Sequence, residues 1–285
     1  MVAPVAHMER EGWRLGFYGR AGAVAPALED ELLSRVLAAA RGELEPVLRR
    51  SRYAATYQVR LAAEGARNFI AYVKLFDRPR GAAALKRRIR GSYAEYALKA
   101  ARMLEAAGFR VSSVLIAGDE RASGRAVLVT RQVDGDFILR LLARRGLEAR
   151  REIMRALGRE VARLHLAGFI HGDLTPFNVF VSRGEPPGFI FIDHERTRRA
   201  PLLNRRRAQL RNLVQLGRFE LNGVSRTDRM RLVCAWADAL GLRNRRKVMN
   251  SVLRMLQRRI GRDGAHIWVG SDGEVAIRHG ANGNG

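Results

Sequence analysis

The sequence predicts an α+β fold in which a small antiparallel sheet with one helix is followed by a larger, mainly helical region. Alternation of apolar and polar residues, typical of strands, dominates residues 55–133, whereas helical periodicity dominates after Gly135. The chain has 285 residues, of which 47% are hydrophobic, and can therefore bury a substantial core as one large domain or as two lobes.

The first 45 residues are expected to form an N-terminal extension that contains an amphipathic helix. Pro26 begins this helix, acidic residues occupy its early turns, and Gly42 ends it. One face repeats apolar residues at four-residue spacing: Leu28, Leu32, Val36 and Ala40. We expect the helix to pack on the rest of the protein, and the pattern assigns it no chemistry.

A β-hairpin is predicted after this extension. Residues 55–61 alternate, residues 62–67 provide a turn, and residues 68–76 form the returning strand. Lys74 lies in that returning strand. A strand lysine often extends from an apolar face to solvent, so Lys74 by itself indicates no function.

One helix interrupts the predicted strands. It runs from about Ser92, a good N-cap, to residue 107 and closes at Gly108. Glu95 lies in its early turns, 21 residues after Lys74. Two further strands are predicted over residues 111–117 and 126–133, separated by a polar turn.

The rest of the chain is predicted to be mainly helical. Helices are predicted over residues 137–143, 147–166, 202–221, 226–240 and 245–260. A final hairpin is predicted over residues 265–279. We expect the Gly/Asn-rich tail, residues 280–285, to be disordered.

Three polar side chains interrupt this helical region in a pattern that indicates chemistry. Asp173 lies in a polar loop, Asn178 follows five residues later, and Asp193 ends the second strand of a short hairpin that turns at residues 184–188. Two carboxylates and an amide are hard oxygen ligands of the kind that hold Mg²⁺ beside a nucleotide's phosphates. One carboxylate can also accept a proton from an attacking hydroxyl. The alternative is that both aspartates only cap turns.

The stretch His171-Gly172-Asp173, with Asn178 five residues beyond the aspartate, resembles the catalytic loop of the protein-kinase-like phosphotransferases. Asp193 matches the metal-binding aspartate of their Asp-Phe-Gly motif. Gly172 replaces the arginine of protein kinases, which is typical of the branch that phosphorylates sugars and small molecules. The resemblance implies a two-lobed kinase fold, ATP and Mg²⁺ as cofactors, Asp173 as the catalytic base, and Asn178 and Asp193 as metal ligands.

The same resemblance assigns roles in the small lobe. Lys74 falls where the third-strand lysine contacts the α- and β-phosphates, and Glu95 falls where a helix glutamate pairs with that lysine, with Glu105 as a rival on the same helix. The loop over the phosphates, residues 49–56, has no glycine, so its backbone N–H groups and Arg52 are the expected phosphate contacts.

The resemblance also divides the chain into an N-terminal extension, a nucleotide-binding lobe, a catalytic and acceptor-binding lobe, and a C-terminal hairpin with a tail. The corresponding ranges are residues 1–45, 46–133, 134–264 and 265–285.

The charge of the chain points to an anionic partner. Lys and Arg total 52 and Asp and Glu total 28, which gives a net charge of +24 and is suited to nucleic acid, an acidic membrane leaflet or a phosphorylated substrate. An arginine run without acidic residues follows Asp193; it either holds a polyanionic acceptor or is a solvated helix face. Its members are Arg196, Arg198, Arg199, Arg205, Arg206, Arg207 and Arg211.

Residues 48 to about 220 resemble the bacterial lipopolysaccharide kinases that phosphorylate Kdo or heptose of the inner core. The resemblance rests on the hairpin with Lys74, the His-Gly-Asp loop and the arginine-rich segment after Asp193. It implies transfer of the γ-phosphate of ATP to a sugar hydroxyl of a lipid-A-linked core. The acceptor would be an anionic glycolipid or phosphorylated sugar, and the basic surface would contact the acidic leaflet of the inner membrane.

Two alternatives remain open from the sequence. One is a soluble small-molecule kinase of the aminoglycoside or choline type, although such enzymes usually have acidic acceptor pockets. The other is an RNA-associated basic protein with a kinase-like body, although the four functional positions of a kinase are intact. We expect a cytoplasmic protein, peripheral on the cytoplasmic face of the inner membrane, because no apolar segment approaches about 20 residues and no secretory leader or cysteine pair is present.

Overall fold

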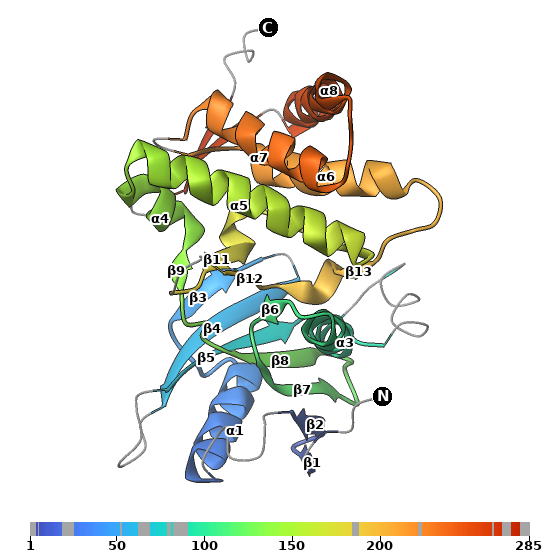
Figure 1. Cartoon of the computed structure of the whole chain (residues 1–285). Helices are drawn as coiled ribbons and strands as arrows, with labels where there is room; N and C mark the ends of the chain where they lie inside the picture. The colour runs from blue at the N-terminus through green and yellow to red at the C-terminus, as the bar shows by residue number, and fades with distance from the viewer. Residues whose placement is uncertain are drawn as a thin grey trace, which may run out of the picture. The chain divides into compact units, whose positions relative to one another are not determined.

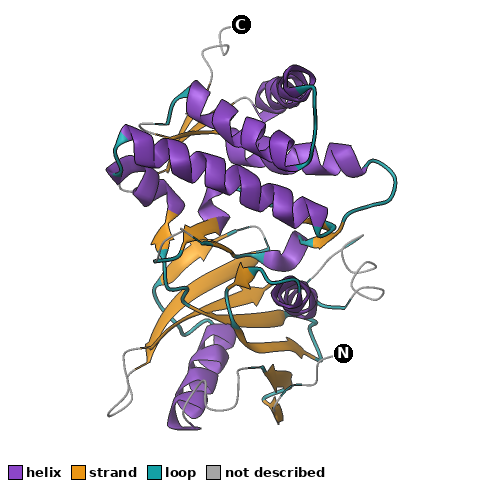
Figure 2. Ribbon diagram, viewed as in Figure 1, coloured by secondary structure: helices purple, strands orange, loops and turns teal. Residues whose placement is uncertain are grey.

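The structure is a computed structural model that describes residues 4, 6–18, 26–51, 53–61, 69–78, 81, 91–183, 188–221, 224–263, 265–269 and 275–279. The chain divides into two compact units, one made of residues 1–106 and 111–133 and the other of residues 107–110 and 134–285 (Figure 1). The first unit is built around an antiparallel sheet, whereas the second is mainly helical (Figure 2). The predicted α+β, two-lobed fold is confirmed.

The first unit contains a seven-stranded sheet in the order β1-β2-β7-β8-β5-β4-β3, in which all neighbouring strands are antiparallel. Its elements are β1 (Ala6–Arg10), β2 (Trp13–Phe17), α1 (Pro26–Arg41), β3 (Val47–Arg50), β4 (Ala54–Leu61), β5 (Phe69–Phe76), α3 (Tyr93–Ala106), β7 (Val114–Glu120) and β8 (Ala126–Arg131).

The sequence pattern did not predict β1 and β2. They join at a tight turn in which Glu11 and Gly12 both have positive φ angles, of 49° and 79°. Trp13 and Leu15 of β2 are buried, at 2% and 0% exposure, with an exposed residue between them. Five residues of alternation are a weak signal, which explains why the hairpin was missed.

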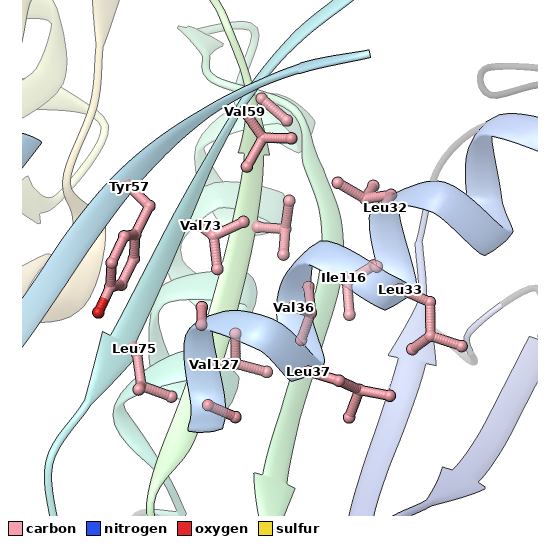
Figure 3. Packing of buried hydrophobic residues seen from close by; sticks show 14 of the residues in the cluster. Leu32, Leu33, Val36, Leu37, Tyr57, Val59, Val73, Leu75, Ile116 and Val127 are labelled. Carbon is pink, nitrogen blue, oxygen red and sulfur yellow. The ribbon is translucent and has the colours of Figure 1, made fainter. Parts of the chain in front are cut away.

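Helix α1 covers one face of the sheet, as the close view in Figure 3 shows. Its apolar side packs onto inward residues of β4, β5, β7 and β8. The contacting residues labelled in the figure are Leu32, Leu33, Val36, Leu37, Tyr57, Val59, Val73, Leu75, Ile116 and Val127. The amphipathic helix of the first 45 residues therefore shares its core with the strands.

Helix α3 covers the other face. Ala97 and Leu98 of α3 pack with Phe76 and Leu128 in a separate cluster. Val127, the neighbour of Leu128, belongs to the cluster under α1, because successive side chains of a strand point to opposite faces. The single predicted helix between strands is α3, and Ser92 caps it through a hydrogen bond from the Glu95 N–H at 3.2 Å.

The second unit is organised around two helices that pack closely along each other, α5 and α7. Gly158 of α5 makes this approach possible, since a Cβ at that position would lie 2.3 Å from the carbonyl oxygen of Leu232 in α7. Its helices are α4 (Ile138–Arg144), α5 (Leu147–Leu166), α6 (Arg205–Gly217), α7 (Arg226–Ala239) and α8 (Arg245–Asp263).

Short strands connect these helices in three small sheets, ordered β6-β12-β11-β9, β10-β13 and β14-β15-β16. The strands are β6 (Arg110–Val111), β9 (Asp136–Phe137), β10 (Phe169–Ile170), β11 (Val179–Val181), β12 (Phe189–Phe191), β13 (Arg198–Arg199), β14 (Phe219–Leu221), β15 (Ala265–Val269) and β16 (Val275–His279). The predicted disordered tail, residues 280–285, lies outside the described residues, as do the predicted turns at residues 62–67 and 184–187.

The helix predicted over residues 202–221 is shorter than expected. It begins at Arg205 because Asn204 has a left-handed backbone, with φ +63°, that a helix cannot continue. It ends at Gly217, and Phe219–Leu221 instead pairs in parallel with β15. Leu202 and Leu203 consequently lie in a loop. Among the described helices, none combines the length and the apolar character that a membrane-spanning segment requires.

Candidate active site

The hairpin of β11 and β12 places Asn178 beside the end of the second strand. Val179 pairs with Phe191, and the Ile192 N–H donates a hydrogen bond of 3.1 Å to the Asn178 carbonyl. Asp193 follows Ile192 directly. Antiparallel pairing thus brings two of the predicted metal ligands to the same end of the hairpin.

Asn178 also holds the loop that carries Asp173. Its side chain is buried, and Nδ2 donates a hydrogen bond of 2.8 Å to the Asp173 carbonyl. Because the amide nitrogen is used in this way, the other side-chain atom, Oδ1, is the oxygen donor suited to a cation. Asn178 is therefore hydrogen-bonded to the backbone of Asp173 and to that of Ile192, the residue before Asp193.

Gly172, which replaces the arginine of protein kinases, is required by its surroundings. Its φ angle is +79°, and a Cβ at this position would lie 2.3 Å from the carbonyl oxygen of Arg196. A residue with a side chain would meet both a strained backbone and a steric clash. The segment after Asp193 packs directly against this loop, residues 171–178, at this point; because the loop carries the predicted base Asp173, it is named the catalytic loop below.

Asp193 adopts a left-handed backbone conformation, with φ 68° and ψ 64°. Such a conformation is unfavourable for a residue with a side chain and persists only where neighbouring contacts enforce it, often at functional sites. One such contact comes from His171, whose Nε2 lies 3.0 Å from the carbonyl oxygen of Ile192. Since a carbonyl can only accept, this nitrogen carries the proton.

The two histidines near the site act as structural groups. Burial lowers the pKa of His171, although Asp193 and Asp173 oppose the shift, and burial lowers the pKa of His194 to about 3. His194 Nε2 is bonded to the Phe191 carbonyl at 3.0 Å, so it pins the strand before Asp193. His171 likewise fixes its loop through the hydrogen bond to the Ile192 carbonyl.

Two residues of α6, which the sequence reasoning missed, fix the backbone of the catalytic loop. Asn212 Oδ1 accepts the His171 N–H at 3.2 Å. Gln215 Oε1 accepts the Leu174 N–H at 3.1 Å, and Gln215 Nε2 donates to the Gly172 carbonyl at 2.8 Å. In the sequence, Asn212 and Gln215 are two amides three residues apart on the apolar side of an arginine-rich helix. Such a pair does not by itself predict which backbone groups the amides bind.

The network continues into the helical core. Trp236 Nε1 donates to His165 Nδ1 at 2.9 Å, and His165 Nε2 lies 3.1 Å from Asn212 Oδ1. Since an indole N–H can only donate, His165 is the neutral tautomer with its proton on Nε2. Desolvation is the main cause that lowers the pKa of His165 to about 4. Helices α5, α6 and α7 are thereby joined to the catalytic loop.

Lys74 lies in the first unit, on the face of the sheet that α3 covers. Its neighbours Val73 and Leu75 point toward α1, so Lys74 points to the other face. Lys74 Nζ lies 5.4 Å from the ring centroid of Phe76, and that ring stacks on Tyr93 at the start of α3, with centroids 5.6 Å apart. Lys74 is half-buried.

Glu95 lies in the first turn of the same helix. Its Oε2 accepts the Ser92 N–H at 3.1 Å, while Ser92 Oγ accepts the Glu95 N–H, which is a reciprocal capping box. Glu105 lies exposed near the other end of α3. Glu95, unlike Glu105, lies at the end of α3 where the Phe76 ring stacks on Tyr93, and Lys74 Nζ lies near that Phe76 ring.

The glycine-free loop over residues 49–56 forms a closed turn between β3 and β4. The Ser51 N–H donates to the Ala54 carbonyl at 2.8 Å, and the Ser51 hydroxyl accepts the N–H groups of Tyr53 and Ala54, at 3.3 and 3.0 Å. Three of the backbone donors expected to approach phosphates are therefore used inside the turn. Arg52, the other expected contact, lies outside the described residues.

The donor set of the second unit suits a magnesium nucleotide rather than a metal bound by protein alone. Within the described ranges, no group of three or more His, Cys, Asp or Glu side chains could hold a metal ion. Mg²⁺ is usually bound by one or two carboxylates together with substrate phosphates and water. The predicted ligands Asp193 and Asn178 would provide such a partial set of oxygen donors, since the hairpin brings their backbones to the same end.

Comparison with known proteins is consistent with this geometry. A model of the lipopolysaccharide kinase (Kdo/WaaP) family matches residues 87–236, more than half of the chain. A solved structure described as WaaP in complex with acyl carrier protein has a similar fold, with a TM-score of 0.56 and 17% identity, over 84% of this chain and 97% of that chain.

A curated relative shares a shorter stretch. The KEOPS complex subunit Bud32 of Pyrococcus abyssi is 34% identical over 67 residues, which cover 24% of this chain and 29% of the relative. The chain thus spans less than a third of the length of this relative. Together with the two-lobed fold, the family match shows that this chain belongs to the lipopolysaccharide kinase (Kdo/WaaP) family of protein-kinase-like phosphotransferases.

Proposed function

We propose that this protein is an ATP-dependent kinase that transfers the γ-phosphate to a sugar hydroxyl of the lipopolysaccharide inner core, Kdo or heptose on lipid A. The observation that carries the proposal is that Asn178 is hydrogen-bonded both to the Asp173 carbonyl and to the Ile192 N–H, directly before Asp193. The family match supports a kinase, and the charge of +24 supports an anionic acceptor.

In the proposed mechanism Asp173 accepts the proton of the acceptor hydroxyl and holds that oxygen for attack on the γ-phosphorus. A positioned base of this kind is usually worth about 10² to 10⁴ in rate. Asp193 and Asn178 would hold Mg²⁺, which neutralises charge on the phosphates when bound. Lys74 would contact the α- and β-phosphates, and Glu95 would orient Lys74.

Arginines after Asp193 are proposed to hold the phosphorylated part of the acceptor. Arg196, Arg198 and Arg207 are exposed, and within the described ranges none of them forms an ion pair with a carboxylate. Guanidinium groups bind phosphate in a bidentate manner, which suits the phosphates of a lipid-A-linked core. Cationic acceptors such as aminoglycosides would be repelled.

The test is phosphate transfer from labelled ATP with Mg²⁺ to a panel of Kdo-lipid A, heptosylated core, an aminoglycoside and casein. We expect label in one of the two glycolipids, and a loss of at least about 10²-fold in Asp173→Asn, which keeps the shape of the side chain but removes the base. Label only in casein or only in the aminoglycoside would refute the proposed acceptor.

A second candidate is an RNA-associated basic protein with a kinase-like body that acts as a subunit of a larger complex. The identity to a KEOPS complex subunit over 67 residues and the net charge of +24 favour it. Tight RNA binding that persists in Asp173→Asn, together with no ATP turnover by either form, would support this candidate against the glycolipid kinase.

A further inference from the structure

The loop between β13 and α6, visible in Figure 1, contains two adjacent exposed leucines. Leu202 is 100% exposed and Leu203 is 82% exposed. Among the side chains that the structure describes, the next most exposed large apolar residue is Leu166, at 59%. Single exposed apolar residues are ordinary, but two adjacent leucines without burial indicate a surface that is covered by something else.

Both ends of this loop are fixed to the end of α5. Arg199 Nη1 donates to the Ala167 carbonyl at 3.0 Å, and Arg205 Nη2 donates to the His165 carbonyl at 2.9 Å. Arg199 also lies over the Phe169 ring, 4.2 Å from its centroid. The leucines therefore project from an anchored base.

The leucines are surrounded by positive charge that is not compensated nearby. No Asp or Glu occurs from Arg196 to Phe219, and the exposed arginines on either side of the loop form no ion pair with any described carboxylate. Partial burial lowers the pKa of Arg206, and the neighbouring charge of Arg205 lowers it further. The exposed arginines of this basic collar are Arg196, Arg198, Arg199, Arg205, Arg206 and Arg207.

A surface hollow next to the loop has the same mixed character. Its volume is about 360 Å³, and it is lined by Leu166, Arg205, Arg206, Gln209 and Leu240. Leucine side chains beside guanidinium groups suit an amphiphile whose phosphate lies next to an apolar chain. A nucleic acid would use the arginines but, unlike a lipid, has no alkyl chain that could take up the two leucines.

We propose that residues 201–204 form a membrane-docking loop, in which Leu202 and Leu203 enter the interfacial region of a bilayer rich in anionic phospholipid while the basic collar binds headgroup phosphates. Apolar insertion combined with arginine binding to an anionic surface provides the two contributions that peripheral membrane binding generally requires. The inference deepens the proposed function, since a lipid-linked acceptor is reached at a membrane, but the docking itself needs neither nucleotide nor acceptor.

The test is flotation of the full chain with vesicles of phosphatidylcholine, alone or mixed with phosphatidylglycerol, in the absence of ATP. We expect binding to the mixed vesicles that falls as salt is raised. The double variant Leu202→Ser/Leu203→Ser should reduce the partition coefficient by about tenfold or more, because two buried leucines are lost. The matched control Leu48→Ser/Leu147→Ser replaces two half-exposed leucines elsewhere and should bind as the wild type does.

A second measurement locates the insertion. Leu202→Trp should be quenched by brominated lipids in the mixed vesicles more strongly than the tryptophans of the wild type, of which Trp13 and Trp236 are buried. Arg198→Gln/Arg207→Gln should weaken binding and reduce its salt dependence. Equal binding by the double leucine variant, or no additional quenching of the inserted tryptophan, would refute the docking loop.

The two proposals fail in different experiments. Wild-type protein that phosphorylates detergent-dispersed glycolipid but ignores anionic vesicles would refute the docking loop and leave the kinase activity intact. Wild-type protein that binds vesicles through Leu202 and Leu203 but phosphorylates neither glycolipid would refute the proposed acceptor and support the docking loop.

Discussion

Two backbone positions limit which residues the catalytic stretch accepts. Gly172 has φ +79° and a Cβ there would lie 2.3 Å from the Arg196 carbonyl oxygen, and Asp193 has φ 68° although it carries a side chain. The first position excludes any Cβ, whereas the second tolerates aspartate only because neighbouring hydrogen bonds enforce it. The residue types at positions 172 and 193 therefore have a structural cause, the backbone conformation, as well as a chemical one.

Substitution of Gly172 tests this cause. We expect Gly172→Ala to lower turnover by at least about tenfold and stability by about 1 to 3 kcal/mol, because left-handed strain and the contact with the Arg196 carbonyl add together. Urea unfolding and ATP turnover measure the two effects. Gly217→Ala is the control, since a Cβ there meets nothing within 4 Å; equal behaviour of the two variants would contradict the explanation.

His165 makes stability depend on pH. Its pKa is about 4 in the folded protein against 6.5 for the unperturbed side chain, so the unfolded chain binds more protons between these values. Stability should be fully present above about pH 6.5 and decrease as the pH falls toward 4, by up to about 1.4 kcal/mol per pH unit from this residue. Urea unfolding at pH 7 and pH 5 measures the loss.

The variant His165→Gln isolates this contribution. Its amide retains a donor for Asn212 and an acceptor for Trp236, but it does not titrate. We expect a shallower decrease between pH 7 and pH 5 than in the wild type, with a remaining slope from His194, whose pKa of about 3 gives the same sign. A slope unaffected by His165→Gln would exclude the assignment.

At the scale of elements, α6 combines two tasks. Its buried side supplies Asn212 and Gln215 to the backbone of the catalytic loop, while its exposed side carries arginines. If these arginines hold the anionic acceptor as proposed, contact with the acceptor would be coupled through α6 to the geometry of the loop. This coupling depends on Gln215, which contacts both sides of Asp173.

Removal of Gln215 should affect catalysis more than folding. Gln215→Ala leaves the Gly172 carbonyl and the Leu174 N–H without their partner, so we expect a stability loss of about 1 to 3 kcal/mol and a kcat reduced by about 10- to 100-fold. Steady-state kinetics at saturating ATP measures kcat. Gln257→Ala, on the exposed side of α8, should retain wild-type values; a variant of Gln215 with normal kcat would show that the loop is held by other contacts.

Helix α3 offers a way to separate two roles of Glu95. Its carboxylate closes a capping box, and the kinase resemblance assigns it to Lys74. Glu95→Gln retains a capping acceptor but removes the charge, whereas Glu95→Ala removes both. We expect Glu95→Ala to lose about 0.5 to 2 kcal/mol of stability.

Kinetics then identify the second role. If Glu95 pairs with Lys74, both variants should raise the KM for ATP, because Lys74 loses its orienting charge. Glu105→Ala serves as the control on the exposed end of the same helix. A normal KM in Glu95→Gln would leave only the capping role.

At the scale of the whole molecule, the first 45 residues are part of the sheet-containing unit. β1 and β2 extend the sheet, and α1 fills one of its faces. We expect Leu33→Ala to destabilise the protein by about 2 to 5 kcal/mol, because Leu33 is fully buried. Thermal unfolding compared with the exposed Arg35→Ala measures this cost, and an unchanged midpoint would mean that α1 is dispensable.

The sequence alone determined the fold class, the pairing of residues 55–61 with 69–76, and the loop around Asp173, because these features depend on short periods and on spacings of a few residues. Its charge and motif also predicted the family that the comparison found.

Only the tertiary structure decided the features that depend on contacts distant in sequence. Asn212 holds the His171 N–H although 41 positions separate the two residues, and β14 pairs with β15 although its sequence predicted the end of a helix. Leu202 and Leu203 were expected inside that helix, but the left-handed Asn204 leaves them in solvent. Local pattern fixes local conformation, whereas the partner of an amide or the exposure of a leucine depends on which segments the folded chain brings together.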